Sequence, residues 1–244
     1  MRGVIFDLGG TLTARVRLAP EDMERANAAS LRSWLRDRGF QIDDGVAGAM
    51  VAERRARFIQ RAAGPEEIRA AEALLPVLGH YGLPTGEEFA AMAERAFFEP
   101  ELHEMRLLPG ALALLDSLAR RGVRRGLASN ASSHYLITEC CRRLGLDRRL
   151  DPILSSAAVG YAKPHPAIFE AILNAWDAAP ADAVMVGDTL AADIAGARAL
   201  GMRCILVTGE HAPDEPMPTD ALRPDGVAID LPAVGVILDA LMSG

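Results

Sequence analysis

Short apolar runs alternate with amphipathic segments along much of the chain. Six runs have the length and apolar character of buried strands: Val4–Phe6, Gly126–Ser129, Ile153–Leu154, Ala183–Val186, Cys204–Val207 and Gly226–Ile229. Five further segments have a helical period: Ala111–Arg121, Ser132–Leu144, Pro166–Trp176, Ala191–Leu200 and Pro232–Leu241. Strands that alternate with helices form a mostly parallel sheet covered on both faces, so the pattern predicts an α/β fold.

The stretch from residue 14 to residue 105 shows only helical periodicity. Four helices are predicted there, separated by glycine and proline: Pro20–Arg38, Asp43–Arg61, Pro65–Leu78 and Thr85–Phe98. No buried strand is expected in this block. The simplest interpretation is an all-α domain, residues 14–105, inserted into an α/β core that comprises residues 1–13 and 106–244.

Composition narrows the class of protein further. The chain has 244 residues, 50% of them hydrophobic, and a net charge of −7, which argues against nucleic acid as a partner. No apolar run approaches the roughly 20 residues that span a bilayer, and the first residues lack the pattern of a secretory signal. Three cysteines, Cys140, Cys141 and Cys204, are too few and too irregularly spaced for a disulfide framework or a zinc site. We expect a cytoplasmic protein without membrane or nucleic-acid partners, monomeric or homodimeric.

Polar residues follow the first two predicted core strands. Asp7 comes directly after Val4–Phe6 and precedes a glycine-rich turn, while Ser129 and Asn130 end the next strand. Ligands bind at the carboxyl ends of the strands in such sheets. Taken alone, Asp7 could be a turn residue and Ser129 a helix cap. A carboxylate nucleophile and groups that hold an oxyanion are the functional alternative.

The later strands add a cation and two further acids. Lys163 precedes a proline and is the only lysine, since the other 25 basic residues are arginines. Asp188 follows Ala183–Val186, and Asp193 stands five residues further on. Two carboxylates can hold a hard cation such as Mg²⁺. A carboxylate, an oxyanion donor, an ammonium and a metal pair around one crevice favour phosphoryl transfer.

With these residues in view, the chain resembles the haloacid dehalogenase superfamily over nearly its whole length. The sequence DLGGTL from Asp7 to Leu12 resembles the first motif of the family, Ser129 the second and Lys163 the third. The sequence GDTLAAD, which ends at Asp193, resembles the fourth. The helical insert resembles the subfamily with an α-helical cap. The resemblance implies a Rossmann-like core and a cap that closes over the site.

The resemblance also implies roles for individual residues. Asp7 would be the nucleophile that forms an aspartyl intermediate, Ser129 would bind the transferring group, and Lys163 would steady both charges. Mg²⁺ would be bound by Asp7, the Gly9 carbonyl, Asp188 and Asp193, the last directly or through water. Substrate contacts are expected from a second group of residues: Gly10, Thr11 and Asn130.

Gly9 departs from the family pattern. The phosphatases of the family usually carry a second aspartate at this position, which protonates the leaving group and later activates water. Such general acid–base help is typically worth about 10²- to 10⁴-fold. Another group supplies the proton, or the leaving group needs none, or turnover is slow.

Three functions remain open at this point. The first is a Mg²⁺-dependent hydrolase of a small phosphorylated metabolite. The second is a carbon–halogen hydrolase, which needs no acid for its leaving group but generally lacks the acidic pair retained here. The third is a binding or regulatory protein that keeps the pocket without efficient turnover. A phosphonate-cleaving enzyme would need a cap lysine for a Schiff base, and residues 14–105 contain none.

Overall fold

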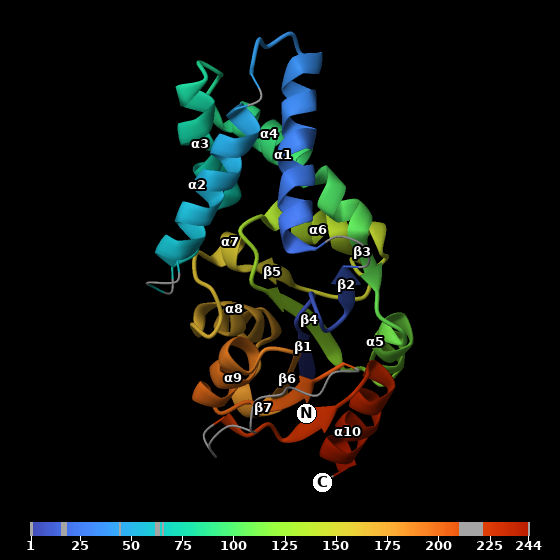
Figure 1. Ribbon diagram of the computed structural model, residues 1–244. Helices are drawn as coiled ribbons and strands as arrows, with labels where there is room; N and C mark the ends of the chain where they lie inside the picture. The colour runs from blue at the N-terminus through green and yellow to red at the C-terminus, as the bar shows by residue number, and fades with distance from the viewer. Residues whose placement is uncertain are drawn as a thin grey trace.

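The core of the molecule is a parallel sheet, seen in Figure 1 below the insert. The computed structural model describes residues 2–15, 19–43, 45–61, 64, 66–209 and 222–243. The sheet has six strands in the order β5-β4-β1-β6-β7-β8. Their bounds are β1 Gly3–Phe6, β4 Arg124–Ser129, β5 Ile153–Ser155, β6 Ala183–Gly187, β7 Arg203–Val207 and β8 Gly226–Ala228. All adjacent pairs are parallel, which confirms the predicted α/β fold.

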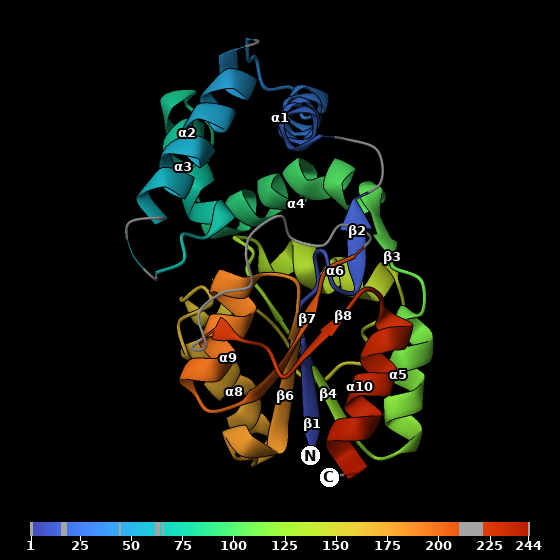
Figure 2. The same ribbon diagram turned by 60° about the horizontal axis from the view of Figure 1, so that its bottom comes forward.

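Helices cover both faces of this sheet (Figure 2). One face carries α5 (Ala111–Arg120), α6 (His134–Arg143) and α10 (Leu231–Ser243), and the other carries α8 (Ala167–Trp176) and α9 (Ala195–Ala199). Short elements join them: α7 Ser156–Val159, η1 Pro180–Asp182 and η2 Leu190–Ile194. None of the helices in the described ranges is long and apolar enough to cross a membrane.

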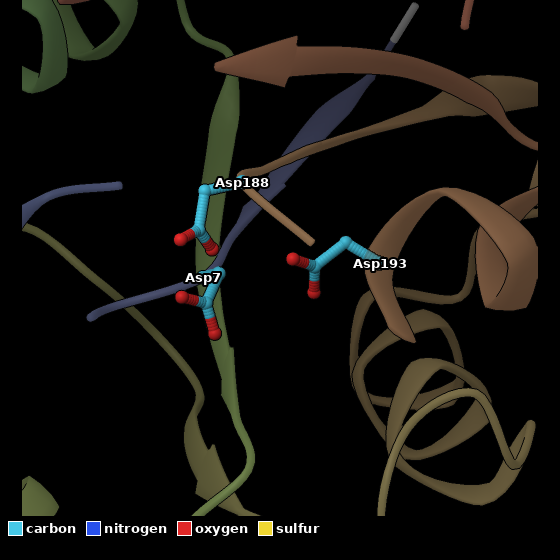
Figure 3. Close-up of side chains that lie close together, drawn as sticks. All are labelled: Asp7, Asp188 and Asp193. Atoms are coloured by element: carbon cyan, nitrogen blue, oxygen red, sulfur yellow. The ribbon is translucent and has the colours of Figure 1, made fainter. Parts of the chain in front are cut away.

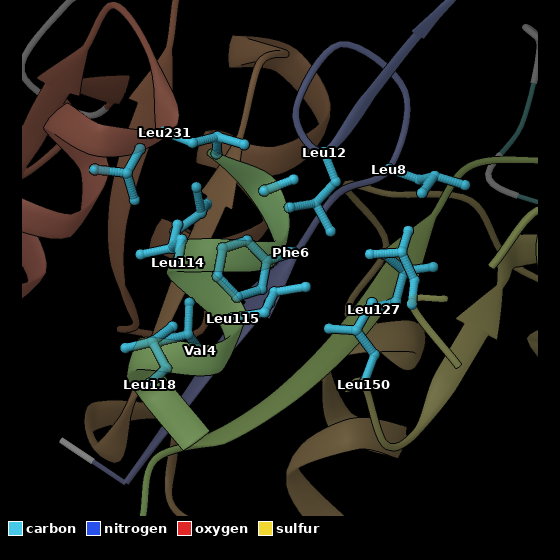
Figure 4. Close-up of a cluster of buried hydrophobic side chains, with 14 of the residues drawn as sticks. Val4, Phe6, Leu8, Leu12, Leu114, Leu115, Leu118, Leu127, Leu150 and Leu231 are labelled. Carbon is cyan, nitrogen blue, oxygen red and sulfur yellow. The ribbon is translucent and has the colours of Figure 1, made fainter. Parts of the chain in front are cut away.

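Strand β1 shows why its sequence is almost entirely apolar. Val4 and Phe6 point into the cluster beneath α5 and α10, which Figure 4 shows, whereas Ile5 packs into the cluster beneath α8 and α9. All three side chains are fully buried. Because successive residues of a strand face opposite sides, a strand covered on both faces needs apolar residues at every position. The burial of β1 therefore places the next residue, Asp7, firmly at the carboxyl edge.

The helical insert has a hydrophobic core of its own. It consists of α1 (Pro20–Asp37), α2 (Gly45–Arg61), α3 (Ala70–His80) and α4 (Glu87–Glu104). Its buried centre includes residues from all four helices, and Phe97 and Phe98 are 1% exposed. The insert lies over the carboxyl edge of the sheet (Figure 1). Separate hydrophobic clusters support the proposed division into a core of residues 1–13 and 106–244 and an insert of residues 14–105.

Two short strands that the sequence pattern does not predict lie at the two ends of the insert. Strands β2 (Thr13–Arg15) and β3 (Met105–Leu107) form a two-stranded antiparallel sheet in which Ala14 faces Arg106. Each strand has only three residues, and their partners lie some ninety positions apart, so neither periodicity nor a hairpin turn reveals them. This small sheet joins the insert to the core at both crossings of the chain.

Three predicted helices also have different bounds. The helix predicted from residue 65 begins only at Ala70, and Glu66 instead forms an isolated bridge with Tyr161 of the core. Helix α4 runs past Pro100 to Glu104, because its last turns bury Leu102. The helix predicted at 191–200 begins as a wider turn, η2, before α9. Four prolines predict a surface loop at residues 211–224, a segment that lies largely outside the described residues.

Candidate active site

Three aspartates meet at the carboxyl edge of the sheet (Figure 3). Asp7 follows β1, Asp188 follows β6, and Asp193 comes from η2. One carboxylate oxygen from each lies within 4.8 Å of the other two. The backbone of Asp7 is held by the neighbouring strand, since its N–H donates to the Val186 carbonyl at 2.9 Å. The adjacent strands β1 and β6 therefore bring together residues that are far apart in the sequence.

Lys163 reaches into this group with its ammonium. Its Nζ donates to Asp7 Oδ1 at 2.7 Å, to Asp193 Oδ1 at 2.6 Å and to the Ala128 carbonyl at 2.6 Å. The lysine side chain is 2% exposed and that of Asp193 is 1% exposed. An ammonium has three donors, and here all three have partners. Lys163 is thus an internal part of the cluster rather than a surface lysine.

Burial and charge act together on these groups. Burial raises the pKa of Asp7 to about 7, with Lys163 opposing the shift and Asp193 adding to it. Burial and the nearby Asp193 also raise the pKa of Asp188. Burial disfavours the charged form of Lys163, but Asp7 and Asp193 outweigh it, so its pKa is raised. Three carboxylates and one ammonium leave an excess of negative charge that a divalent cation would neutralise.

The donor set fits Mg²⁺. Asp7, Asp188 and Asp193 supply carboxylate oxygens, which hard cations prefer, and the spacing of these atoms allows one ion to contact more than one of them. Thr189 orients the acids: its N–H donates to Asp193 Oδ2 at 3.0 Å, and its hydroxyl donates to Asp188 Oδ1 at 3.3 Å. The Gly9 carbonyl remains a predicted ligand.

Two glycines allow this close approach. A Cβ at Gly10, whose φ is +86°, would overlap the Asp188 carboxylate, and a Cβ at Gly187 would overlap Asp193. Gly9 is different, because a Cβ there would meet nothing within 4 Å. The space that a second aspartate would occupy is therefore open.

Ser129 and Asn130 lie beside the aspartates. Both line the same cavity as Asp7. Asn130 also holds the peptide of Lys163 from both sides: its Oδ1 accepts from the Lys163 N–H at 2.7 Å, and its Nδ2 donates to the Lys163 carbonyl at 2.9 Å. The predicted substrate residue Asn130 is thus at the same time the residue that orients the lysine.

Thr11 is the one predicted site residue that the structure places away from the cavity among the described residues. It is fully buried and does not line the cavity that contains Asp7 and Gly10. Its hydroxyl has no hydrogen-bond partner within the described part of the chain. Thr11 belongs to the DLGGTL motif and was expected to contact substrate, but the turn directs its side chain into the interior.

The cavity itself has a volume of about 490 Å³. Its polar end is formed by the aspartates and Lys163. The opposite wall is mostly apolar and includes residues of the insert and of α6: Ala14, Met105, Leu136, Ile137 and Cys140. Glu101 of α4 also lines this wall and accepts from Asn27 Nδ2 at 3.2 Å. Sequence patterns did not single out Glu101, because one acid on an amphipathic helix is normally a solvated residue.

A parallel α/β sheet with an acidic, lysine-containing cavity at its carboxyl edge is the arrangement of an α/β enzyme that binds its ligand at the strand ends. Comparison with known proteins identifies the family. A profile of haloacid dehalogenase-like hydrolases matches residues 1–201. The chain therefore belongs to the haloacid dehalogenase-like hydrolases, which confirms the resemblance seen in its motifs.

Individual relatives extend this comparison. The chain is 35% identical over 127 residues to ribulose-1,5-bisphosphate 5-phosphatase from Halopiger xanaduensis, covering 52% of each chain. It is 35% identical over 161 residues to phosphoserine phosphatase from Thermus thermophilus, covering 66% of this chain and 62% of the other. The chain thus spans about half to two thirds of the length of these relatives.

A solved structure matches the whole chain. The 2-haloacid dehalogenase from Pseudomonas syringae is 26% identical, covers 99% of each chain and superposes with a TM-score of 0.71. A phosphatase of the family from Thermococcus onnurineus superposes with a TM-score of 0.59 at 21% identity over 98% of each chain, which shows a shared fold. The fold alone thus accommodates both kinds of substrate.

Proposed function

We propose that the protein is a Mg²⁺-dependent phosphatase that acts on a small phosphorylated metabolite through an aspartyl-phosphate on Asp7. The observation that carries this proposal is the buried cluster in which Lys163 bridges Asp7 and Asp193 while Asp188 stands alongside. The phosphatase names of the relatives from Halopiger and Thermus support the same reaction. A cavity of about 490 Å³ fits a small substrate.

The two carboxylate oxygens of Asp7 have different roles in the proposed reaction. Lys163 donates to Asp7 Oδ1, so Oδ2 is the oxygen that we propose attacks phosphorus. A bond forms between Oδ2 and phosphorus while the bond from phosphorus to the leaving oxygen breaks. Water then attacks phosphorus, releases inorganic phosphate and regenerates Asp7. Ser129 would donate to a phosphoryl oxygen. The Lys163 ammonium, whose three N–H groups are held by Asp7, Asp193 and the Ala128 carbonyl, would offset the phosphoryl charge by its position beside Asp7.

Mg²⁺, when bound, would neutralise phosphoryl charge that otherwise repels the attacking carboxylate. Asp188 and Asp193 would hold the ion together with Asp7 and the Gly9 carbonyl. The two acids differ in their surroundings, since Asp193 is buried against Lys163 whereas Asp188 is exposed. Asp193 therefore also fixes the lysine, and Asp188 faces the open cavity.

Replacing Asp193 with asparagine should weaken Mg²⁺ binding by about 10- to 100-fold, because the site loses a negative charge and an oriented ligand. The measurement is the rise in unfolding temperature on adding Mg²⁺, which needs no turnover. Asp147→Asn is the matched control, since Asp147 lies outside the catalytic cavity. An equal Mg²⁺-dependent rise in the Asp193→Asn and control proteins would argue against Asp193 as part of the metal site.

Gly9 limits the leaving groups that the enzyme can handle. With no side chain there to donate a proton, departure of an alkoxide is slow, whereas an acyl phosphate releases a stable carboxylate. We therefore propose that substrates with good leaving groups react fastest. The open space around Gly9 makes this proposal testable by restoring the missing acid.

Gly9→Asp should raise the rate of alkyl phosphate hydrolysis by about 10²-fold or more, because a general acid typically supplies that much. The initial burst of acetate released from acetyl phosphate, a step that needs no acid, should change far less. Gly9→Ala is the matched control, since it adds a Cβ in the same open space without a carboxyl group. If both variants hydrolyse glycerol phosphate at the wild-type rate, the missing acid is not what limits the enzyme.

A carbon–halogen hydrolase is the second candidate, because the Pseudomonas syringae structure carries that name and Gly9 removes a group that halide departure does not need. The acidic trio argues against it, since displacement of halide needs no metal. Chloride release from 2-chloropropionate in the presence of a chelator would favour this candidate. Phosphate release that requires Mg²⁺ favours the phosphatase. Stabilisation by phosphate without any turnover would favour a binding protein.

A further inference from the structure

Glu67 of the insert is buried against the core. It precedes α3 and is 9% exposed, although it lies outside β2 and β3, the strands that join the insert to the core, and outside the aspartate cluster. Its carboxylate accepts a hydrogen bond from the Ser156 hydroxyl at the start of α7. A buried carboxylate costs free energy unless hydrogen bonds compensate it. This contact therefore depends on the insert being seated on the core.

The backbone around Glu67 is attached to the core as well. The Glu67 N–H donates to the Gly160 carbonyl at 2.8 Å, and the Ala70 N–H donates to the Ser132 carbonyl at 2.7 Å. These bonds lie far along the chain from β2 and β3, where the insert is covalently joined to the core. The insert thus has a second, noncovalent attachment.

Ser156 links Glu67 to the segment Ser129–Ala131. Its Oγ accepts a hydrogen bond from the Ala131 N–H at 2.9 Å while its hydroxyl donates to Glu67. Ala131 directly follows Ser129 and Asn130, and Asn130 holds the Lys163 peptide through two hydrogen bonds. A continuous chain of contacts therefore joins the insert to the lysine of the site.

We infer that Glu67 is a positioning residue that, through Ser156, holds the Ser129–Ala131 segment in place for catalysis. The inference rests on the proposed phosphatase function for its effect on turnover. It also has a consequence that needs no turnover: the Ala131 amide is protected from solvent exchange only while Ser156 is held.

The role of Glu67 is tested by comparing Glu67→Ala, Glu67→Gln and Ser156→Ala with a matched control, Glu99→Gln. Glu99 also joins the insert to the core, but through an ion pair at 3.0 Å with Arg143, which lies near the end of α6 and not in the 129–131 segment. Two quantities are measured on the full chain. They are hydrogen exchange of the amides at 129–133, and kcat and KM for p-nitrophenyl phosphate with Mg²⁺.

Glu67→Ala should lower kcat roughly tenfold, since a hydrogen bond to a charged group contributes about that much, with KM nearly unchanged and faster exchange at 129–133. Glu67→Gln keeps an acceptor for Ser156 and should retain most of the wild-type kcat. Adding Glu67→Ala to Ser156→Ala should have no further effect, because both changes break the same chain of contacts. Ser156→Ala supplies the test if Glu67→Ala does not fold.

Equal exchange and equal kcat in Glu67→Ala, Ser156→Ala and Glu99→Gln would overturn the inference. So would losses from Glu67→Ala and Ser156→Ala that add in the double variant. A wild-type protein without phosphatase activity would contradict the proposed function alone. In that case exchange at 129–133 still decides the role of Glu67, because it is read without substrate.

Discussion

Asp7→Asn stops phosphate release, with kcat lowered by at least about 10⁴-fold, as expected when a reacting group is removed. The amide has the shape of the carboxylate but no charge, so its oxygen is a poor nucleophile toward phosphorus. The substitution also removes the negative partner of the Lys163 ammonium at 2.7 Å. Phosphate release with Mg²⁺ from acetyl phosphate or p-nitrophenyl phosphate measures the effect.

The matched control for Asp7→Asn is Asp147→Asn, which makes the same chemical change outside the catalytic cavity. The control should keep the wild-type kcat. Thermal unfolding of both variants shows whether the loss of activity follows from loss of the fold. Robust turnover by a folded Asp7→Asn protein would rule out Asp7 as the nucleophile.

Lys163→Ala should abolish hydrolysis and also destabilise the metal-free protein by about 3–5 kcal/mol, the usual cost of removing one partner of a buried ion pair. The ammonium donates to two carboxylates and to the Ala128 carbonyl. Because the lysine side chain is only 2% exposed, bulk water does not replace these hydrogen bonds when the ammonium is removed. Urea unfolding in the presence of a chelator measures the change in the free energy of unfolding.

The pH dependence of this destabilisation has a definite sign. Without the ammonium, nothing opposes the effect of burial and of the nearby Asp193 on Asp7, so the folded-state pKa of Asp7 rises further above its unfolded value. The stability deficit of Lys163→Ala is therefore smallest at acidic pH, where Asp7 is protonated, and widens as pH rises. A deficit that stayed constant between acidic and neutral pH would contradict the assigned charges.

Lys163→Arg is the sharper form of the same test. A guanidinium is broad and planar, whereas the observed pocket has acceptors on three sides of a compact ammonium, each within 2.7 Å. We expect Lys163→Arg to lose nearly all activity. Near-normal activity would mean that positive charge alone suffices at this position. Lysine occurs nowhere else in the chain, which fits a requirement for an ammonium here.

The core strands were predictable because strands covered on both faces must be apolar at every position. Val4, Ile5 and Phe6 meet this condition, and the residue after them is therefore placed at the carboxyl edge. Their lateral order was not predictable, because each pairing joins distant segments. The contact of β1 with β6, which brings Asp7 near Asp188, depends on that order.

The small elements of the insert escaped prediction for a related reason. Arg15 and Met105 pair in a sheet of three-residue strands, and so short a strand has no detectable period. The helix expected from residue 65 starts late because Glu66 and Glu67 bind the core instead. In both cases a tertiary contact, absent from local sequence, decides the backbone.

In the site, too, some residues could be identified from the sequence and others only from tertiary contacts. The motifs single out Asp7, Lys163 and Asp193 because they follow strand ends, and these three side chains lie in one cluster. The residues that orient them, such as Asn130 on the Lys163 peptide, have no sequence signature for that role. Glu101 reaches the cavity from α4, because only the packing of the insert over the core places it there.

In the proposed reaction Asp7 becomes phosphorylated during turnover. Because Gly9 offers no side chain to activate water, the aspartyl-phosphate should accumulate and be trappable. The direct measurement is to quench the enzyme with acid during turnover of acetyl phosphate and Mg²⁺, reduce it with borohydride and identify the modified residue by peptide mass spectrometry. We expect homoserine at position 7, the product of reducing an aspartyl-phosphate there. Turnover that leaves Asp7 unreduced, or a phosphorylated residue elsewhere, would contradict it.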